Sequence, residues 1–231
     1  MLTLEQLRIT QGDFSLTADF SVPQGARLAL IGPSGAGKST LLNLIAGYLE
    51  PTAGRVLWQG RDITGQPPGQ RPVSMLFQDN NHFPHLSVAQ NIGLGLRPDL
   101  RLSAAQHEQV AQALSRVGLD GLGGRKPGTL SGGQQSRAAL ARVLVQRRAL
   151  VLLDEPFSAL GPALKAEMLD LVAALVTETG ATLLMVSHDP DDARRIAPLA
   201  SVVADGTVSA PMDTETLLAT PPAALRAYLG A

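Results

Sequence analysis

Cysteine is absent from this chain of 231 residues, and its absence excludes disulfide bonds, thiolate zinc sites and cysteine nucleophiles. Long hydrophobic runs are also missing, because no apolar stretch reaches the about 18 residues that a membrane-spanning helix needs. The opening segment lacks the basic flank and apolar core of a signal peptide. We therefore expect neither a membrane-spanning segment nor a secretion signal.

Neither sign of charge is in excess, since 19 Lys and Arg balance 20 Asp and Glu to give a net charge of −1. That balance argues against a broad nucleic-acid-binding surface, and no nucleic acid is expected as a partner. Lysine itself is rare, occurring only as Lys38, Lys126 and Lys165. Apolar residues still make up 45% of the chain, which predicts a globular domain with ample material for a core.

The sequence patterns on either side of the middle segment predict a sheet with helices. Alternating or short apolar runs predict strands, and a helix is expected from Lys38 to a capping Gly47. Two continuous apolar runs have the length of buried parallel strands, and a helix beginning at Pro162 separates them. A hairpin turn is expected at Asp205 and Gly206, with helix after Asp213. The expected strands cover 2–9, 14–20, 27–31, 55–58, 73–77, 150–153 and 182–186.

The middle of the chain differs, because residues 87–146 carry helical signals and almost no strand signal. Ser103 and Gln106 form a predicted capping box, and a second helix is expected after Ser131. We therefore predict an α/β fold of one domain. An α-helical lobe over 87–147 is expected within a core formed by 1–86 and 148–231.

A phosphate-binding loop is predicted after the strand at 27–31, where the chain fits the pattern Gly-x4-Gly-Lys-Ser/Thr. In this pattern the backbone N–H groups at a helix N-terminus surround phosphate oxygens, Lys38 supplies a positive charge, and Ser39 offers a hydroxyl to Mg²⁺. The alternative is a glycine-rich turn that only caps a helix; the flanking strand and helix favour the nucleotide. The loop consists of Gly32, Pro33, Ser34, Gly35, Ala36, Gly37, Lys38, Ser39 and Thr40.

Two adjacent carboxylates, Asp154 and Glu155, follow the buried strand at 150–153. Ligands gather at the carboxyl edge of a parallel sheet, and two acids buried together need a cation or distinct roles. We expect Asp154 to hold Mg²⁺ and Glu155 to orient or deprotonate the water that attacks the γ-phosphate. Without the phosphate loop, an ordinary helix cap would be the better interpretation.

A second segment that favours anions occurs at Leu130, Ser131, Gly132, Gly133 and Gln134, where a serine and two glycines open a helix. Taken alone, an ordinary flexible N-cap would be the better interpretation. One chain would then carry two phosphate-binding helix ends, which a nucleotide shared between two subunits requires.

The order of these motifs, with Gln78 and His188, resembles the ATP-binding subunit of ABC transporters over essentially the whole chain. The resemblance implies a P-loop NTPase core with an N-terminal antiparallel β region, ATP and Mg²⁺ as cofactors, and a head-to-tail dimer with a second copy. In that dimer, ATP lies between Lys38 of one copy and Ser131, Gly132, Gly133 and Gln134 of the other. The resemblance also implies that Gln78 senses Mg²⁺ and the γ-phosphate, and that His188 contacts the γ-phosphate.

Three positions depart from the family pattern. The family usually has the sequence Ser-Ala-Leu-Asp after the catalytic glutamate, whereas this chain reads Ser158-Ala-Leu-Gly161. Gly161 therefore replaces an aspartate that communicates across the dimer in the family. No Trp or Tyr precedes the phosphate loop, so only Phe14 or Phe20 could stack on adenine, and strand core is an equal alternative for Phe14. Ser136 stands where the family often has another glutamine, which we treat as neutral.

The same ATPase cassette drives importers, exporters and soluble repair or translation factors. This chain has no long heptad insertion, no second cassette and no fused membrane helices, so a subunit serving a separate integral membrane permease is expected. The resemblance places it peripherally at the cytoplasmic face of the inner cell membrane, with a solute-binding protein as an indirect partner. A soluble ATPase without a permease is the alternative.

The stretch from Leu76 to Leu96, which includes the pair Asn80 and Asn81, resembles ATP-binding subunits of bacterial thiamine importers. The resemblance therefore implies thiamine or its phosphates as the solute, while iron, sulfate and polyamine importers are the alternatives. In this family the segment after Gln78 forms part of the groove for the permease's coupling helix. Candidates for that contact are Phe83, Pro84 and Leu86, whose alternative is local packing of a loop.

Overall fold

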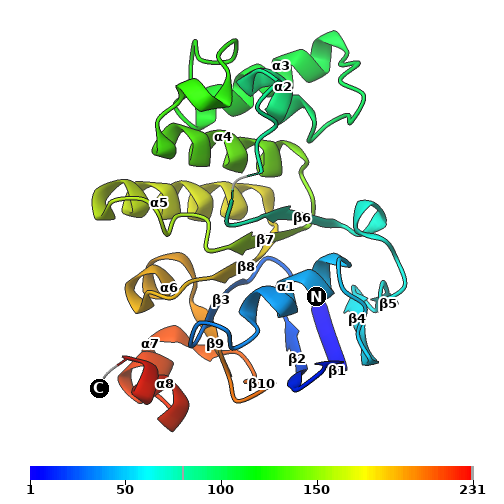
Figure 1. Ribbon diagram of the computed structural model, residues 1–231, viewed down its shortest axis with the longest axis vertical. Helices are drawn as coiled ribbons and strands as arrows, with labels where there is room; N and C mark the ends of the chain where they lie inside the picture. The colour runs from blue at the N-terminus through cyan, green and yellow to red at the C-terminus, as the bar shows by residue number, and fades with distance from the viewer. Residues whose placement is uncertain (80, 230–231) are drawn as a thin grey trace.

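A mixed sheet organises the core of the computed structural model, which describes residues 1–79 and 81–229 (Figure 1). Its strands lie in the order β5-β4-β1-β2-β10-β9-β3-β8-β7-β6, and β11 pairs with β9. The strands are β1 (Leu2–Gln11), β2 (Phe14–Val22), β3 (Arg27–Ile31), β4 (Ala53–Trp58), β5 (Arg61–Asp62), β6 (Val73–Leu76), β7 (Leu150–Asp154), β8 (Thr182–Val186), β9 (Leu199–Ala204), β10 (Thr207–Val208) and β11 (Met212–Asp213).

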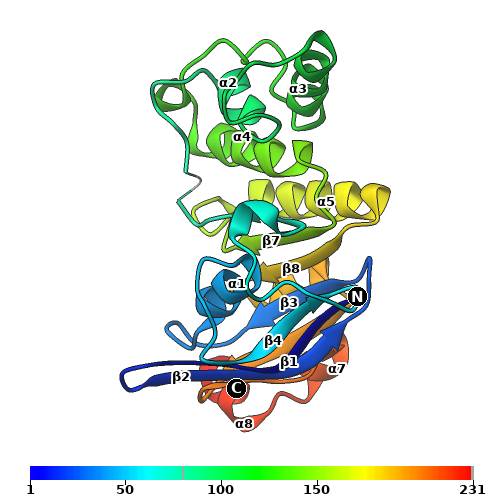
Figure 2. The same cartoon turned by 90° about the vertical axis from the view of Figure 1, so that its right-hand side faces the viewer.

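Helices cover this sheet and form a separate lobe above it (Figures 1 and 2). They are α1 (Lys38–Ala46), α2 (Val88–Gly93), α3 (Ala104–Arg116), α4 (Gly132–Val145), α5 (Pro162–Thr179), α6 (Pro190–Ile196), α7 (Thr214–Ala219) and α8 (Ala223–Leu229). Short 3₁₀ turns occupy Pro68–Gln70 and Pro127–Thr129. In the described part of the chain, no helix has both the length and the apolar character needed to cross a bilayer.

The strands β6, β7, β8, β3 and β9 run parallel, so their carboxyl ends meet at one edge. Successive side chains of a strand point to opposite faces. Leu28 and Leu30 accordingly pack on the face that α1 covers, whereas Ala29 and Ile31 pack on the face of α5 and α6. The predicted α/β fold is confirmed, and the polar groups that follow these strands are brought to the same edge.

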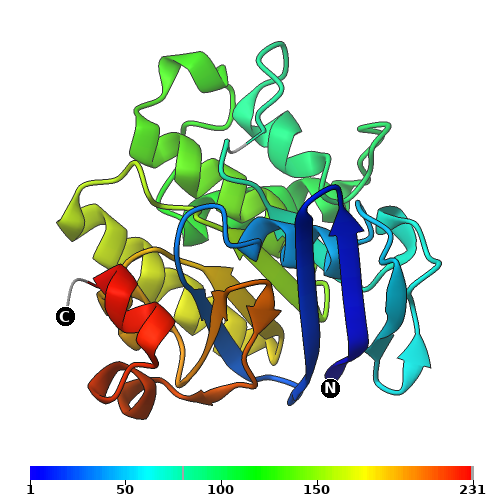
Figure 3. The same ribbon diagram turned by 60° about the horizontal axis from the view of Figure 1, so that its bottom comes forward.

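The N-terminal part of the sheet is antiparallel, because β1 pairs with both β2 and β4. Figure 3 shows β1 and β2 side by side, next to the later strands β9 and β10. The pairing shifts register between Leu4 and Leu7, where Gln6 has a φ of 44°. This bulge was not predicted, although the apolar alternation breaks at that point.

The helices α2, α3 and α4 surround their own apolar cluster, which includes Val88, Ile92 and Val110. Helix α4 contributes Ala138 and Ala141 to that cluster and Leu140 to the core beneath α5. One helix therefore joins the lobe to the core. The predicted capping boxes at Ser103 and Ser131 are both present, and a third, unpredicted box at Ser87 begins α2.

A buried arginine holds three segments of the core together. Arg71 is 1% exposed, and its guanidinium donates to the carbonyls of Leu44 and Ile45 at 2.8 and 2.9 Å. It also donates to the carbonyls of Thr64 and Gln66 at 2.5 and 2.8 Å. The first two acceptors lie in the last turn of α1, where cations are favoured. The far end of the phosphate-loop helix is thus bonded to the segment that leads into β6.

Replacing Arg71 by methionine is expected to lower the free energy of unfolding by about 2–4 kcal/mol, because buried carbonyls lose their donor. Methionine keeps much of the side-chain volume, so the loss reports the hydrogen bonds rather than a cavity. Urea unfolding of the full chain measures the effect. The exposed Arg61→Met is the control and is expected to stay within about 0.5 kcal/mol of the wild type. An Arg71→Met variant as stable as this control would contradict the assigned role.

Candidate active site

The phosphate loop lies between β3 and α1, as its pattern predicts, and two of its glycines are required by their neighbours. Gly32 has a φ of 149°, and a Cβ there would lie 2.1 Å from the carbonyl oxygen of Val203. A Cβ on Gly37, which has a φ of 104°, would lie 2.9 Å from the ring of Phe14. The loop can therefore approach β9 and β2 only with glycine at these positions.

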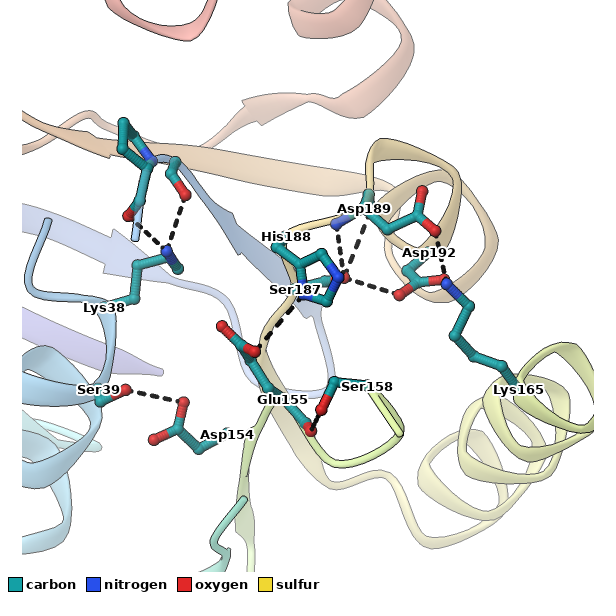
Figure 4. A network of polar contacts seen from close by, with 12 residues as sticks. Lys38, Ser39, Asp154, Glu155, Ser158, Lys165, Ser187, His188, Asp189 and Asp192 are labelled. Atoms are coloured by element: carbon teal, nitrogen blue, oxygen red, sulfur yellow. Dashed lines mark hydrogen bonds and ion pairs between the residues drawn. The ribbon is translucent and has the colours of Figure 1, made fainter. Parts of the chain in front are cut away.

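The ammonium of Lys38 lies inside the loop and is 5% exposed. Its Nζ donates to the carbonyl oxygens of Gly32 and Pro33, both at 2.7 Å (Figure 4). Burial lowers the pKa of Lys38, and the charges of Glu155 and Asp154 partly oppose that shift. A buried ammonium with two carboxylates nearby matches the requirement for binding phosphate oxygens and a divalent cation together.

Ser39 and Asp154 meet at the junction of α1 and β7. The hydroxyl of Ser39 donates to Oδ1 of Asp154 at 3.0 Å. Burial raises the pKa of Asp154, an effect that the Ser39 hydrogen bond opposes and the charge of Glu155 increases. A hydroxyl and a carboxylate in contact are the oxygen ligands that Mg²⁺ prefers, so these two residues fit the predicted metal site.

Glu155 follows directly in the chain and turns toward the switch segment 187–189 at the end of β8. Its φ of 45° is unusual for a residue with a side chain, and its N–H donates to the carbonyl of Val186 at 3.3 Å. Oε2 lies 3.5 Å from Nδ1 of His188. Figure 4 shows the two side chains facing each other. The structure therefore brings together Lys38, Ser39, Asp154, Glu155 and His188 at one sheet edge.

Sequence reasoning missed the network that surrounds the switch segment. Lys165 of α5 donates to Oδ2 of Asp189 at 2.5 Å and pairs with Oδ1 of Asp192 at 2.8 Å. Ser187 also donates to Asp192, at 2.8 Å. Burial alone would lower the pKa of Lys165, but the hydrogen bonds that it donates to its two carboxylate partners raise it. The scarcity of lysine was a signal, since Lys165 is one of three in the chain.

The two aromatic candidates for adenine have different surroundings. Phe20 is 7% exposed and belongs to the apolar core of the sheet. Phe14 is partly buried and touches the phosphate loop at Gly37, as described above. Only Phe14 therefore lies where a base attached to bound phosphates could reach it.

Neither Gln78 nor the glycine segment at 131–134 is hydrogen-bonded to this cluster within the described chain. Gln78 is exposed just beyond β6, at the same sheet edge as Asp154, but no hydrogen bond of the described residues joins it to Ser39 or Asp154. Ser131 caps α4 in the helical lobe, away from α1 (Figure 1). A Cβ on Gly132 would meet nothing within 4 Å, whereas one on Gly133 would lie 2.3 Å from Leu164. The space beside Gly132 is thus open, whereas a side chain at residue 133 would require Leu164 to move.

The segment after Gln78 is attached to the signature helix α4. The ring of His82 bonds through Nε2 to the carbonyl of Gln135 at 2.8 Å, and Arg142 donates to the carbonyl of Asn81 at 2.7 Å. Of the predicted asparagine pair, Asn80 lies outside the described residues. Ser136, in the same helix, is buried. Residue 82 is therefore bonded to the first turn of α4, and residue 81 to its last turn.

Comparison with known proteins agrees with this geometry. A family model described as "ABC transporter" matches residues 16–158, more than half of the chain. The thiamine import ATP-binding protein ThiQ of Cereibacter sphaeroides is 62% identical over 230 residues, with 100% of both chains covered. A protein of the same name from Ruegeria sp. (strain TM1040) is 61% identical over 231 residues, again with 100% of both chains covered.

Solved structures show the same cassette. A nucleotide-free ATP-binding cassette from an ABC transporter matches with a TM-score of 0.88 at 26% identity, over 100% of this chain and 99% of that one. The cassette MJ0796, in a dimeric post-hydrolysis state bound to ADP and Pi, gives a TM-score of 0.81 at 27% identity, over 93% and 99%. With its phosphate loop, its acid pair and this likeness, the chain belongs to the ABC transporter family and carries its ATP-hydrolysing domain.

Proposed function

We propose that this chain hydrolyses ATP to energise the import of thiamine through a separate membrane permease. The assignment of thiamine as the solute rests on the 62% identity, over 100% of both chains, to a protein named for thiamine import. The residues at the sheet edge support the ATPase chemistry. Import of iron, sulfate or polyamine by the same type of subunit is the competing possibility.

Each residue of the site has a distinct part in the proposed reaction. The N–H groups of the loop from Gly32 to Thr40 and the ammonium of Lys38 bind the phosphates of ATP. Ser39 and Asp154, with Gln78, would hold Mg²⁺, whose charge neutralises the phosphate oxygens when it is bound. Glu155 takes the proton of the attacking water, and His188 contacts the γ-phosphate.

The remaining part of the site comes from a second copy of the chain in this proposal. Ser131, Gly132, Gly133 and Gln134 open α4 in the helical lobe, where they cannot reach the Lys38 of their own chain without rearrangement of the fold (Figure 1). A head-to-tail dimer brings the N-terminus of the partner's α4 to the γ-phosphate. The solved cassette MJ0796, which is dimeric with ADP and Pi, supports a dimer of this type of chain. ATP binding then closes the dimer, and hydrolysis reopens it.

A groove beside β6 is the proposed docking place for the permease. Its lining includes Tyr48, Phe77, Phe83 and Leu94, and the residues Tyr48 and Phe83 are 54% and 47% exposed. Exposed aromatic side chains in a groove favour an apolar helix face as partner. Of the other predicted contacts, Pro84 is exposed and Leu86 is half-buried. This docking would hold the chain peripherally at the cytoplasmic face of the inner membrane.

The proposed solute is tested by reconstitution in liposomes of the complex that co-purifies with the tagged full-length chain, together with its solute-binding protein. We expect thiamine to stimulate ATP hydrolysis, with thiamine phosphates, ferric iron, sulfate and spermidine as the compared solutes. Stimulation by one of the latter three, without an effect of thiamine, would assign a different cargo. Detergent extraction that yields no integral membrane protein would favour the soluble ATPase instead.

Gly161 is the position at which the chain departs most clearly from its family, and it is the N-cap of α5 with φ −65° and ψ 156°. A Cβ there would meet no atom within 4 Å. Gly161→Asp should therefore fit and cap α5, raising the free energy of unfolding by about 0.5–1 kcal/mol. The new carboxylate should also change the steady-state ATPase rate of the assembled complex. Urea unfolding and phosphate release measure the two effects, with Gly161→Ala as the uncharged control. An unchanged rate would contradict the second expectation.

A further inference from the structure

The C-terminal helix α8 contacts the switch segment that carries His188. The hydroxyl of Tyr228 donates to the backbone carbonyl of His188 at 2.7 Å. The two residues are forty positions apart in the chain, so the bond joins the C-terminal end of the fold to the sheet edge.

Tyr228 is well placed to act as a fixed donor. Leu225, one turn earlier on the same helix, is fully buried, and Tyr228 packs against the cluster that includes Leu217 and Leu218. Burial raises the pKa of Tyr228, and the negative charges of Glu155 and Asp189 add to the increase. The hydroxyl therefore keeps its proton over the whole physiological range and continues to donate.

The switch segment is held from its other side as well. Ser187 is bonded to Asp192, and Asp189 to Lys165, as described above. His188 lies between these two anchored residues with its side chain 51% exposed, and its ring is 3.5 Å from Glu155. Tyr228 bonds to its backbone carbonyl, so this hydrogen bond restrains the backbone from which the ring projects toward Glu155.

We propose that Tyr228 is a positioning residue for ATP hydrolysis, in which the C-terminal helix holds the His188 peptide in its productive orientation. The inference rests on the proposed contact of His188 with the γ-phosphate. Loss of the hydroxyl frees the ring of His188 without unfolding α8, because the aromatic ring of residue 228 still packs on the same apolar cluster.

Tyr228→Phe tests the proposal in the full-length chain assembled with its permease. We expect kcat to fall about three- to tenfold, as for the loss of one hydrogen bond, with the KM for ATP changed less than about twofold. Arg226→Gln, on the exposed side of the same helix, should keep the wild-type kcat. Equal melting temperatures of the two variants show that α8 remains folded.

A second measurement reports the orientation directly. The chain has 4 histidines, so the imidazole resonances of His188 can be assigned and followed by NMR in the isolated full-length protein. Tyr228→Phe should shift or broaden the His188 signals and leave those of His82, His85 and His107 unchanged. Unchanged His188 signals, or a wild-type kcat in Tyr228→Phe while His188→Ala is impaired, would overturn the inference. A wild-type kcat in His188→Ala, with the His188 signals still altered in Tyr228→Phe, would instead overturn the proposed role of His188 and leave the positional contact standing.

Discussion

Replacing Glu155 with glutamine is expected to stop ATP turnover while leaving ATP bound. Glutamine keeps the size of the side chain and its hydrogen-bonding reach, but it cannot take a proton from water at neutral pH. Removal of a general base lowers kcat by about 10²- to 10⁴-fold. Because Lys38, Ser39 and Asp154 are untouched, the affinity for ATP should stay within about threefold of the wild type.

The same variant should accumulate as a closed dimer, because hydrolysis is the step that is proposed to reopen it. Size-exclusion chromatography with ATP and Mg²⁺, alongside phosphate release, measures both properties. Glu5→Gln, which removes an exposed carboxylate paired with Arg55, is the matched control and should hydrolyse ATP normally. Near-normal phosphate release by Glu155→Gln would refute the assignment of the base.

Replacing Lys38 with methionine is expected to lower the affinity for ATP by about two to three orders of magnitude. In the proposed site the lysine would donate charge-assisted hydrogen bonds to two phosphate groups, each typically about 1.5–3 kcal/mol. The ammonium already lies inside the loop and is buried, whereas the other two lysines, Lys126 and Lys165, bond elsewhere.

Isothermal titration calorimetry of the full chain with ATP and Mg²⁺ gives the affinity directly. Lys126→Met is the control, because that ammonium donates to the carbonyl of His85 far along the chain from the loop. It should bind ATP as the wild type does. A Lys38→Met variant that retained wild-type affinity would show that the loop N–H groups suffice, and the role assigned to Lys38 would be wrong.

Most elements of the core could be predicted because their signals are local. The apolar runs at 150–153 and 182–186 are observed as β7 and β8, and the helix expected at Pro162 begins there. The two predicted capping boxes are likewise formed by residues three positions apart. Site residues such as Lys38 and Glu155 could be named because a motif surrounds them.

Contacts between distant residues could not be predicted in the same way. Arg71 donates to backbone carbonyls, a group that every residue carries, so no residue type marks its partners. Tyr228 has the same kind of acceptor, in the peptide of His188. Lys165 pairs with carboxylates of the switch segment and helix α6, and several other acidic residues in the sequence would have been equal candidates. The sequence pattern names the candidate reacting groups here, but not the groups that bond to the segments carrying them.

The sheet order also sets when the phosphate loop can form during synthesis. Strand β3, which leads into the loop, pairs with β8 and β9, so that Leu28 lies between Leu184 and Leu199. Both neighbours leave the ribosome long after β3, and such distant pairings make folding slow. A nascent chain that ends before β8 has its loop on a strand without either neighbour. Nucleotide binding should therefore arise late in folding, although the loop is among the first segments to be made.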